Sequence, residues 1–149
     1  MSPPSPPTAA PAAVPSFAFR VRAYYEDTDA GGVVYYASYL RFLERARTEW
    51  LRTFGVDQRR LNAEGGPLFV VRSVQIDYLS PARLDDELTV ITSIKTLGGA
   101  SVSFLQRVER AGTLLVSAEV RIVAVSIQSG RATPIPKALH EQFQACLPH

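Results

Sequence analysis

Residues 24–39 read YYEDTDAGGVVYYASY, and this stretch carries most of what the sequence says about fold and chemistry. Three acidic residues lie within four positions, a pair of glycines follows, and an amphipathic segment starts soon afterwards. This order predicts a carboxylate beside a turn that glycine loosens, at the positive end of a helix dipole. Such an arrangement is suited to hold an oxygen on which negative charge develops and to attack the atom beside it.

The amphipathic segment predicts a long helix over residues 38–54. Its apolar residues recur at helical spacing, at Tyr39, Leu43, Ala46, Trp50 and Phe54. Gly55 follows as a typical residue at the end of a helix. At 1.5 Å per residue such a helix is about 26 Å long. Its wide apolar stripe requires a large covering surface.

A sheet is the expected cover, because five segments show strand-like alternation or many β-branched residues. They are residues 17–25, 68–78, 87–97, 101–110 and 114–127. Short turns separate the last four segments, which predicts that each pairs in antiparallel orientation with the next. A short helix is expected over residues 137–146. The sequence thus predicts an α+β fold in which a five-stranded antiparallel sheet wraps a long central helix and leaves open edges that favour a second copy.

One domain is expected from the length of 149 residues and the hydrophobic fraction of 46%. Residues 1–16 are rich in Pro and Ala and have no charged side chain, so we predict a disordered tail before a domain at residues 17–149. The tail lacks the basic residues and the apolar run of a signal peptide. No segment has the apolar length that spans a bilayer. These features predict a cytoplasmic protein.

The charged and sulfur-containing residues exclude several classes of function. The formal net charge is +2 and the arginines are scattered, so no nucleic-acid partner is predicted. A codon bias explains the excess of Arg over Lys better than phosphate recognition does. Cys146 is the single cysteine, which excludes an internal disulfide. The acids of residues 26–29 lack His or further carboxylates at ligand spacing, so no metal and no other cofactor is predicted.

The acids and glycines of the loop each have two interpretations from the residues alone. Asp29 is either a carboxylate that acts on a substrate or a side chain that caps the loop. For Asp27 the loop-stabilising interpretation is favoured. Gly31 and Gly32 either let a substrate approach the backbone or permit a turn with positive φ. The tyrosines of residues 24–39 either line a substrate slot or belong to the core.

Motifs along most of the chain resemble one known family. The motifs are RxYYEDTDAGGVVYxASY (residues 22–39), ERAR (44–47), FVVR (69–72), DY (77–78) and PARLDD (81–86). Together they resemble the 4-hydroxybenzoyl-CoA thioesterase family of hotdog-fold proteins, and within it the Tol-Pal-associated acyl-CoA thioesterases. The similarity covers residues 17–135.

The resemblance implies a hotdog fold, homodimers or homotetramers with joined sheets, and active sites at the subunit interface. It implies that the substrate is acyl-CoA, which is hydrolysed to free CoA and a carboxylic acid. The family's catalytic carboxylate falls on Asp29, and the Tol-Pal-associated members imply a peripheral link to membrane-associated complexes. Tyr36 departs from the pattern, because those members usually carry His there, whereas the hydroxybenzoyl-CoA enzymes accept an aromatic residue.

Thioester hydrolysis requires a donor for the carbonyl oxygen and a group that brings oxygen to the carbonyl carbon. The backbone N–H of Tyr36, near the start of the helix, is the expected donor. Asp29 acts either as a base toward water or as a nucleophile that forms a mixed anhydride. The expected substrate-binding residues are Gly31, Gly32, Val33 and Tyr35.

Two other functions fit parts of the sequence. A hydratase or dehydratase on the same fold is disfavoured, because such enzymes need a His beside the carboxylate and the loop has none. A non-catalytic acyl-binding or scaffold protein of a membrane-associated complex is the alternative from a different class. Release of thiol from acyl-CoA distinguishes an enzyme from such a binding protein.

Overall fold

The structure is a computed structural model that describes residues 14–148. Most of the tail that we predict over residues 1–16 therefore lies outside the described residues. The first strand, β1 (Ser16–Arg22), begins at the last residue of that stretch. No helix within the described residues is long and apolar enough to cross a membrane.

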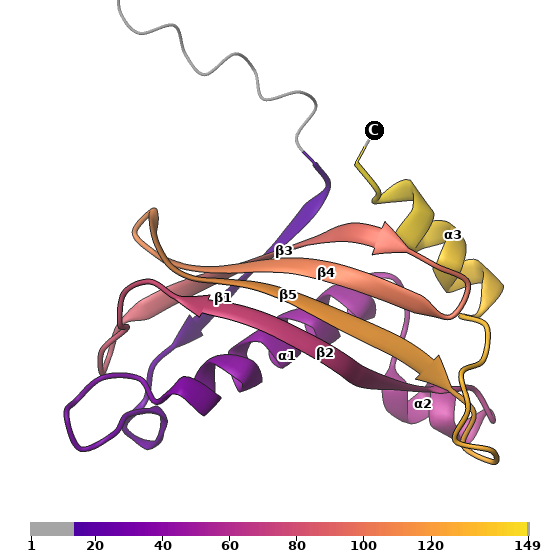
Figure 1. The fold of residues 1–149 in the computed structure, drawn as a ribbon, viewed down its shortest axis with the longest axis horizontal. Coiled ribbons are helices and arrows are strands. Elements are labelled where there is room, and N and C mark those ends of the chain that lie inside the picture. Colours follow the sequence, from indigo (N-terminus) through magenta and orange to yellow (C-terminus); the bar gives the residue numbers. More distant parts are fainter. Residues whose placement is uncertain (1–13, 149) are drawn as a thin grey trace, which may run out of the picture.

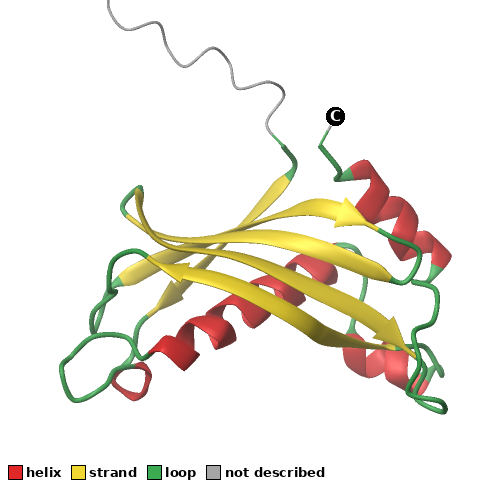
Figure 2. Ribbon diagram, viewed as in Figure 1, coloured by secondary structure: helices red, strands yellow, loops and turns green. Residues whose placement is uncertain are grey.

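Five antiparallel strands form a single sheet in the order β1-β3-β4-β5-β2 (Figures 1 and 2). The strands after β1 are β2 (Leu68–Tyr78), β3 (Glu87–Leu97), β4 (Ser101–Arg110) and β5 (Thr113–Val125). The expected pairing holds from β3 to β4 and from β4 to β5. This antiparallel sheet, with the long helix against it, confirms the predicted hotdog fold.

The predicted pairing of β2 with β3 is wrong. β3 already has β1 on one side and β4 on the other, while β2 pairs with β5 at the opposite edge of the sheet. Residues 79–86 make a crossing connection instead of a tight turn. At its start the N–H groups of Leu79 and Ser80 both donate to the carbonyl of Leu115, which keeps the chain beside β5.

The long helix α1 (Tyr36–Thr53) lies across the curved sheet and supplies the centre of the core (Figure 1). Phe42, Leu43 and Ala46 on α1 are fully buried, as are Leu88 and Val90 on β3. The helix begins two residues before the predicted start at position 38, so Tyr36 is its first residue. Gly55 follows its end with a φ of 79°, which suits glycine at this position.

Two shorter helices close the end of the core near the last turn of α1. The expected C-terminal helix is confirmed as α3 (Lys137–Ala145), whose Phe143 ring lies 6.0 Å from that of Phe104. The helix α2 (Gln58–Ala63) is not among our predictions, because six residues are too few to show periodicity. Its start is nevertheless marked by Asp57, whose side chain accepts a hydrogen bond from the N–H of Arg59.

The strand that we predict over residues 17–25 ends earlier, at Arg22. A short 3₁₀ helix, η1 (Tyr25–Asp27), replaces its last part. The chain turns here because the carboxylate of Asp27 accepts a hydrogen bond from the N–H of Tyr24. This turn brings the acidic loop to the start of α1.

Candidate active site

Asp27 anchors the loop between β1 and α1. The residue is 4% exposed, and its side chain accepts hydrogen bonds from the N–H of Tyr24 at 2.9 Å and from Arg41 at 3.1 Å. Its carbonyl accepts a hydrogen bond from the N–H of Tyr35 at 2.8 Å and one from the Ser38 hydroxyl at 3.1 Å. Asp27 therefore joins both ends of the loop to the first turn of α1, in agreement with the favoured loop-stabilising interpretation.

Asp29 projects from the same loop and is exposed. Its Oδ1 atom accepts a hydrogen bond of 2.8 Å from the N–H of Gly31, which is the capping contact expected of Asp before glycine. Its Oδ2 atom has no hydrogen bond to any residue of the described chain. The two interpretations of Asp29 are therefore compatible, because capping uses one oxygen and leaves the other for chemistry.

Glycine is favoured at positions 31 and 32 for different structural reasons. Gly32 has a φ of 78°, a left-handed conformation that favours glycine. A side chain at Gly31 would place its Cβ 3.3 Å from Oδ1 of Asp29, so a larger residue would crowd the carboxylate. Neither glycine lines the cleft described next. In the described structure both glycines therefore affect the conformation of the loop and not the lining of the cleft.

A cleft of about 440 Å³ lies between this loop, the start of α1 and the end of β2, and we call it the Asp29 cleft. Asp29, Val33, Tyr35 and Tyr36 line it, which brings together four of the predicted site residues. The opposite wall consists of residues 78–81, about forty positions further along the chain. An exposed carboxylate and the start of a helix thus share one cleft.

The first turn of α1 offers unpaired backbone donors. Its N-cap residue, Tyr35, makes no side-chain hydrogen bond to the helix. Within the described residues, the N–H groups of Tyr36 and Ala37 have no acceptor, whereas that of Ser38 donates to the carbonyl of Tyr35. Unpaired N–H groups at the positive end of a helix dipole favour a negatively charged oxygen.

Aromatic rings form much of the wall beside these donors. The Tyr36 ring lies 4.8 Å from that of Tyr78, and the Tyr78 hydroxyl donates to the Tyr36 carbonyl at 3.4 Å. Burial raises the pKa of Tyr78, and the neighbouring Tyr36 raises it further, so Tyr78 stays neutral near pH 7. Our predicted site omits Tyr78, although the DY motif at residues 77–78 was the available signal.

Tyr39 belongs to the core and also reaches the cleft. It is 2% exposed, and its hydroxyl accepts a hydrogen bond of 2.9 Å from the N–H of Ala82. Burial raises the pKa of Tyr39, so its hydroxyl also remains protonated near pH 7. This contact fixes the connection between β2 and β3 against α1. It therefore sets the width of the Asp29 cleft.

Asp86 holds the other end of that connection. Its Oδ2 atom accepts hydrogen bonds from Arg110 at 2.7 Å and from the N–H of Arg83 at 2.8 Å. Burial by itself raises the pKa of Asp86, but these two hydrogen bonds and the charges of both arginines outweigh it and lower the pKa. Arg110 also donates to the carbonyl of Pro81, which lines the Asp29 cleft.

A pH-dependent contribution to stability follows from this lowered pKa. Because the folded pKa of Asp86 lies below the unfolded one, its stabilisation is present above about pH 4 and is lost as the pH falls further. Urea unfolding between pH 6 and pH 3 should show a steeper loss of stability for the wild type than for Asp86→Asn. Equal slopes for the two proteins would contradict the assigned role of Asp86.

Comparisons with known proteins agree with this fold. The family profile of the thioesterase-like superfamily matches residues 24–143, and the chain belongs to this superfamily. It is 48% identical over 129 residues to the acyl-CoA thioester hydrolase YbgC of Escherichia coli, covering 86% of this chain and 96% of that protein. It is 46% identical over 127 residues to the acyl-CoA thioesterase YbgC of Haemophilus influenzae, covering 85% and 93%.

Solved structures give the same result for the fold. The crystal structure of a probable thioesterase from Bartonella henselae superposes with a TM-score of 0.78 at 37% identity. The superposition covers 82% of this chain and 100% of that one. This agreement over most of both chains shows that the Asp29 cleft lies in a fold that the two proteins share.

Proposed function

We propose that this protein hydrolyses acyl-CoA thioesters to free CoA and a carboxylic acid. The observation that supports this most directly is the unpaired Oδ2 of Asp29, in the same cleft as the unpaired N–H groups at the start of α1. The high identity to two acyl-CoA thioesterases supports the choice of substrate class. The residues and the relatives thus support the same chemistry.

In the proposed reaction the thioester carbonyl oxygen accepts a hydrogen bond from the N–H of Tyr36. Asp29 Oδ2 then either removes a proton from a water that attacks the carbonyl carbon or attacks that carbon itself. In the first route the tetrahedral intermediate expels the CoA thiolate and leaves the carboxylic acid. In the second route a mixed anhydride forms as the thiolate leaves, and water hydrolyses it.

In this proposal the remaining residues of the loop contact or position the substrate. Val33 and Tyr35 line the cleft and would contact the acyl group directly. Gly31 and Gly32 would act by holding the loop so that the thioester approaches the backbone. Oδ1 of Asp29, bonded to the N–H of Gly31, keeps the carboxylate oriented during the reaction.

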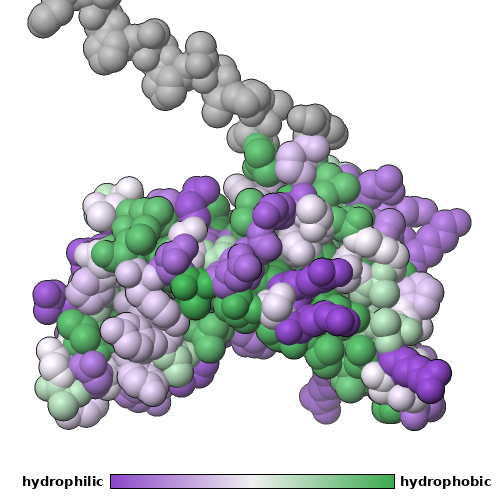
Figure 3. All heavy atoms as spheres, viewed as in Figure 1, coloured by the Kyte–Doolittle hydropathy of each residue, from purple (hydrophilic) through white to green (hydrophobic). Residues whose placement is uncertain are grey.

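We further infer that the working form is a homodimer or homotetramer. β2 is an edge strand on which Val70 and Val71 are 39% and 50% exposed, and such an edge is able to pair with a second copy. Apolar patches between charged side chains also reach the surface seen in Figure 3. Sedimentation that finds only a monomer would contradict this inference. The cytoplasmic location stays a prediction from the sequence features, and the peripheral link to membrane-associated complexes stays one from the resemblance.

A panel of acyl-CoA substrates tests the proposed function. Purified protein is mixed with short-chain, long-chain and aryl-CoA thioesters, and the free thiol is measured over time. We expect saturable release from at least one class of substrate. If no substrate releases thiol while acyl-CoA still binds, the protein is the non-catalytic acyl-binding alternative.

A further inference from the structure

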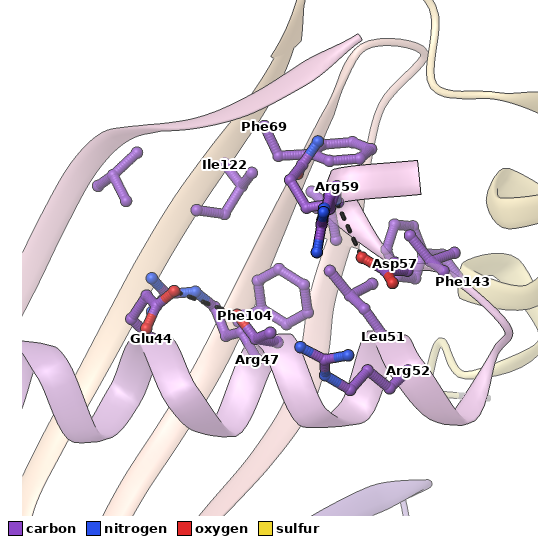
Figure 4. A pocket seen from close by; sticks show the side chains of 15 residues that line it. Glu44, Arg47, Leu51, Arg52, Asp57, Arg59, Phe69, Phe104, Ile122 and Phe143 are labelled. Carbon is purple, nitrogen blue, oxygen red and sulfur yellow. Dashed lines mark hydrogen bonds between the residues drawn. The ribbon is translucent and has the colours of Figure 1, made fainter. Parts of the chain in front are cut away.

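A second cavity of about 340 Å³ lies further along α1, and we call it the Arg47 cavity. It is enclosed by the second half of α1, the start of α2, the sheet and α3 (Figure 4). Much of its wall is apolar, with contributions from Leu51, Phe69, Phe104, Ile122 and Phe143. It shares no lining residue with the Asp29 cleft.

Arg47 is the unusual residue of this cavity. It projects from α1 between the helix and the sheet and is only 8% exposed (Figure 4). Its Nη1 atom donates to Oε1 of Gln106 at 2.9 Å. The amide nitrogen of Gln106 donates in turn to the carbonyl of Leu43 and to the hydroxyl of Thr92. Within the described residues no carboxylate lies at ion-pair distance from Arg47.

Two nitrogens of Arg47 remain without a partner. Every fully enclosed side-chain nitrogen or oxygen in the described residues has a hydrogen-bond partner. Only Nη1 of Arg47 makes such a bond, so Nε and Nη2 are not fully enclosed, and Arg47 is among the residues that line the cavity. These two atoms form the edge of the guanidinium that binds both oxygens of a carboxylate side by side.

The charge of Arg47 is retained although the residue is buried. Burial lowers the pKa of Arg47 to about 10, and the nearby charge of Glu44 acts in the opposite direction. The guanidinium is therefore positive at neutral pH. A buried cation without a counter-ion is unfavourable, so an anion that enters the cavity gains a strong interaction.

Of the four other charged groups that line this cavity, three have partners of their own, and the fourth, Arg59, is exposed to solvent. Arg52 pairs with Glu49 at 3.3 Å, and Glu44 accepts a hydrogen bond from Thr48. Asp57 caps α2. Among the described residues that line this cavity, Arg47 is thus the one buried cation.

We propose that the Arg47 cavity binds a carboxylate with an apolar chain, such as a medium-chain fatty acid. The carboxylate binds Nε and Nη2 of Arg47, and the chain packs against Phe69, Phe104 and Ile122. The volume lies within the range of small-molecule sites, about 300–1,000 Å³. An inorganic anion would satisfy Arg47 but leave the apolar walls in contact with water. This site is independent of the proposed thioesterase activity.

The test uses the full chain and the fluorescence of Trp50, the only tryptophan. Its ring lies 6.2 Å from that of Phe104, which lines the cavity. Octanoate should give a saturable change, with an affinity at least about tenfold higher than that of octanol or inorganic phosphate. Equal affinity for octanol would overturn the role of the charge, and equal affinity for phosphate would overturn the role of the chain.

Variants separate this site from other places where octanoate binds. Arg47→Met should weaken octanoate binding at least about tenfold and leave octanol binding within about twofold. Arg52→Met is the matched control, since Arg52 lines the same cavity but is half-exposed and paired. It should change octanoate binding by less than about twofold. An unchanged affinity in Arg47→Met would overturn the proposal.

Two further variants make the result independent of folding and of catalysis. Arg47→Lys keeps the charge but lacks the paired N–H groups, so it should fold and bind octanoate about threefold or more weakly. Circular dichroism confirms folding, and Arg47→Lys decides the test if Arg47→Met does not fold. Octanoate binding to Asp29→Asn should equal that of the wild type, so failure of the thioesterase proposal leaves this result intact. Loss of binding in Asp29→Asn would instead place the ligand in the Asp29 cleft.

Discussion

Asp29→Asn should lower kcat for acyl-CoA hydrolysis by at least about 10²-fold, while KM changes little. Asn keeps the shape of the side chain and an oxygen that accepts the hydrogen bond from the N–H of Gly31. The loop therefore keeps its conformation in this variant. The amide can neither remove a proton from water nor attack the thioester carbon, so only the chemical step is lost.

The matched control for this variant is Glu26→Gln. Glu26 lies in the same loop and is exposed, but it does not line the Asp29 cleft. Its neutralisation removes the same charge from the loop and should leave kcat within about twofold, since an exposed charge is largely screened. Retained turnover in Asp29→Asn, or an equal loss in Glu26→Gln, would remove Asp29 from the mechanism.

Asp27→Ala should lower the free energy of unfolding by roughly 2–3 kcal/mol, because it removes a buried carboxylate that accepts two hydrogen bonds. The N–H of Tyr24 loses its acceptor, and Arg41 loses its ion pair at 3.1 Å. Arg41 is half-exposed, so solvent compensates part of that second loss. Urea unfolding at pH 7 measures the change.

Variants of the two aspartates should lose different properties of the protein. Asp29→Asn should reduce turnover at nearly unchanged stability, whereas Asp27→Ala should reduce both, because the loop loses the contact of the Asp27 carboxylate with Arg41 on α1. Glu26→Ala controls for the loss of an acid from the loop and should leave stability nearly unchanged. An Asp27→Ala protein as stable as the wild type would contradict the anchoring role of Asp27.

Local patterns in the sequence predict most of the secondary structure. The apolar spacing from Tyr39 to Phe54 indicates α1, and alternation indicates all five strands. The position of β2 could not be obtained this way, because strand order depends on contacts between distant segments. The antiparallel pairing of β2 with β5, continued by the hydrogen bonds of Leu79 and Ser80 to Leu115, shows where β2 lies.

The candidate site likewise combines residues that local patterns predict with residues that they do not. Asp29, Val33, Tyr35 and Tyr36 lie close in sequence, so one motif was enough to predict that they share a site. Tyr78 belongs to the opposite wall, and nothing in the spacing along the chain predicts its ring 4.8 Å from that of Tyr36. Local patterns do not predict the hydrogen bond between Arg47 and Gln106 either, because 59 positions separate the two residues.

The Asp29 cleft takes its reactive groups from one continuous run of chain and its facing wall from another. The wall at residues 78–81 is held by Tyr39 and by the contact of Arg110 with Pro81, neither of which involves the carboxylate. A chimaera that imports this wall from a relative would therefore change one side of the cleft and keep Asp29 and the start of α1 in place. The facing wall and the reactive groups belong to separate segments, so substitutions are able to alter one without altering the other.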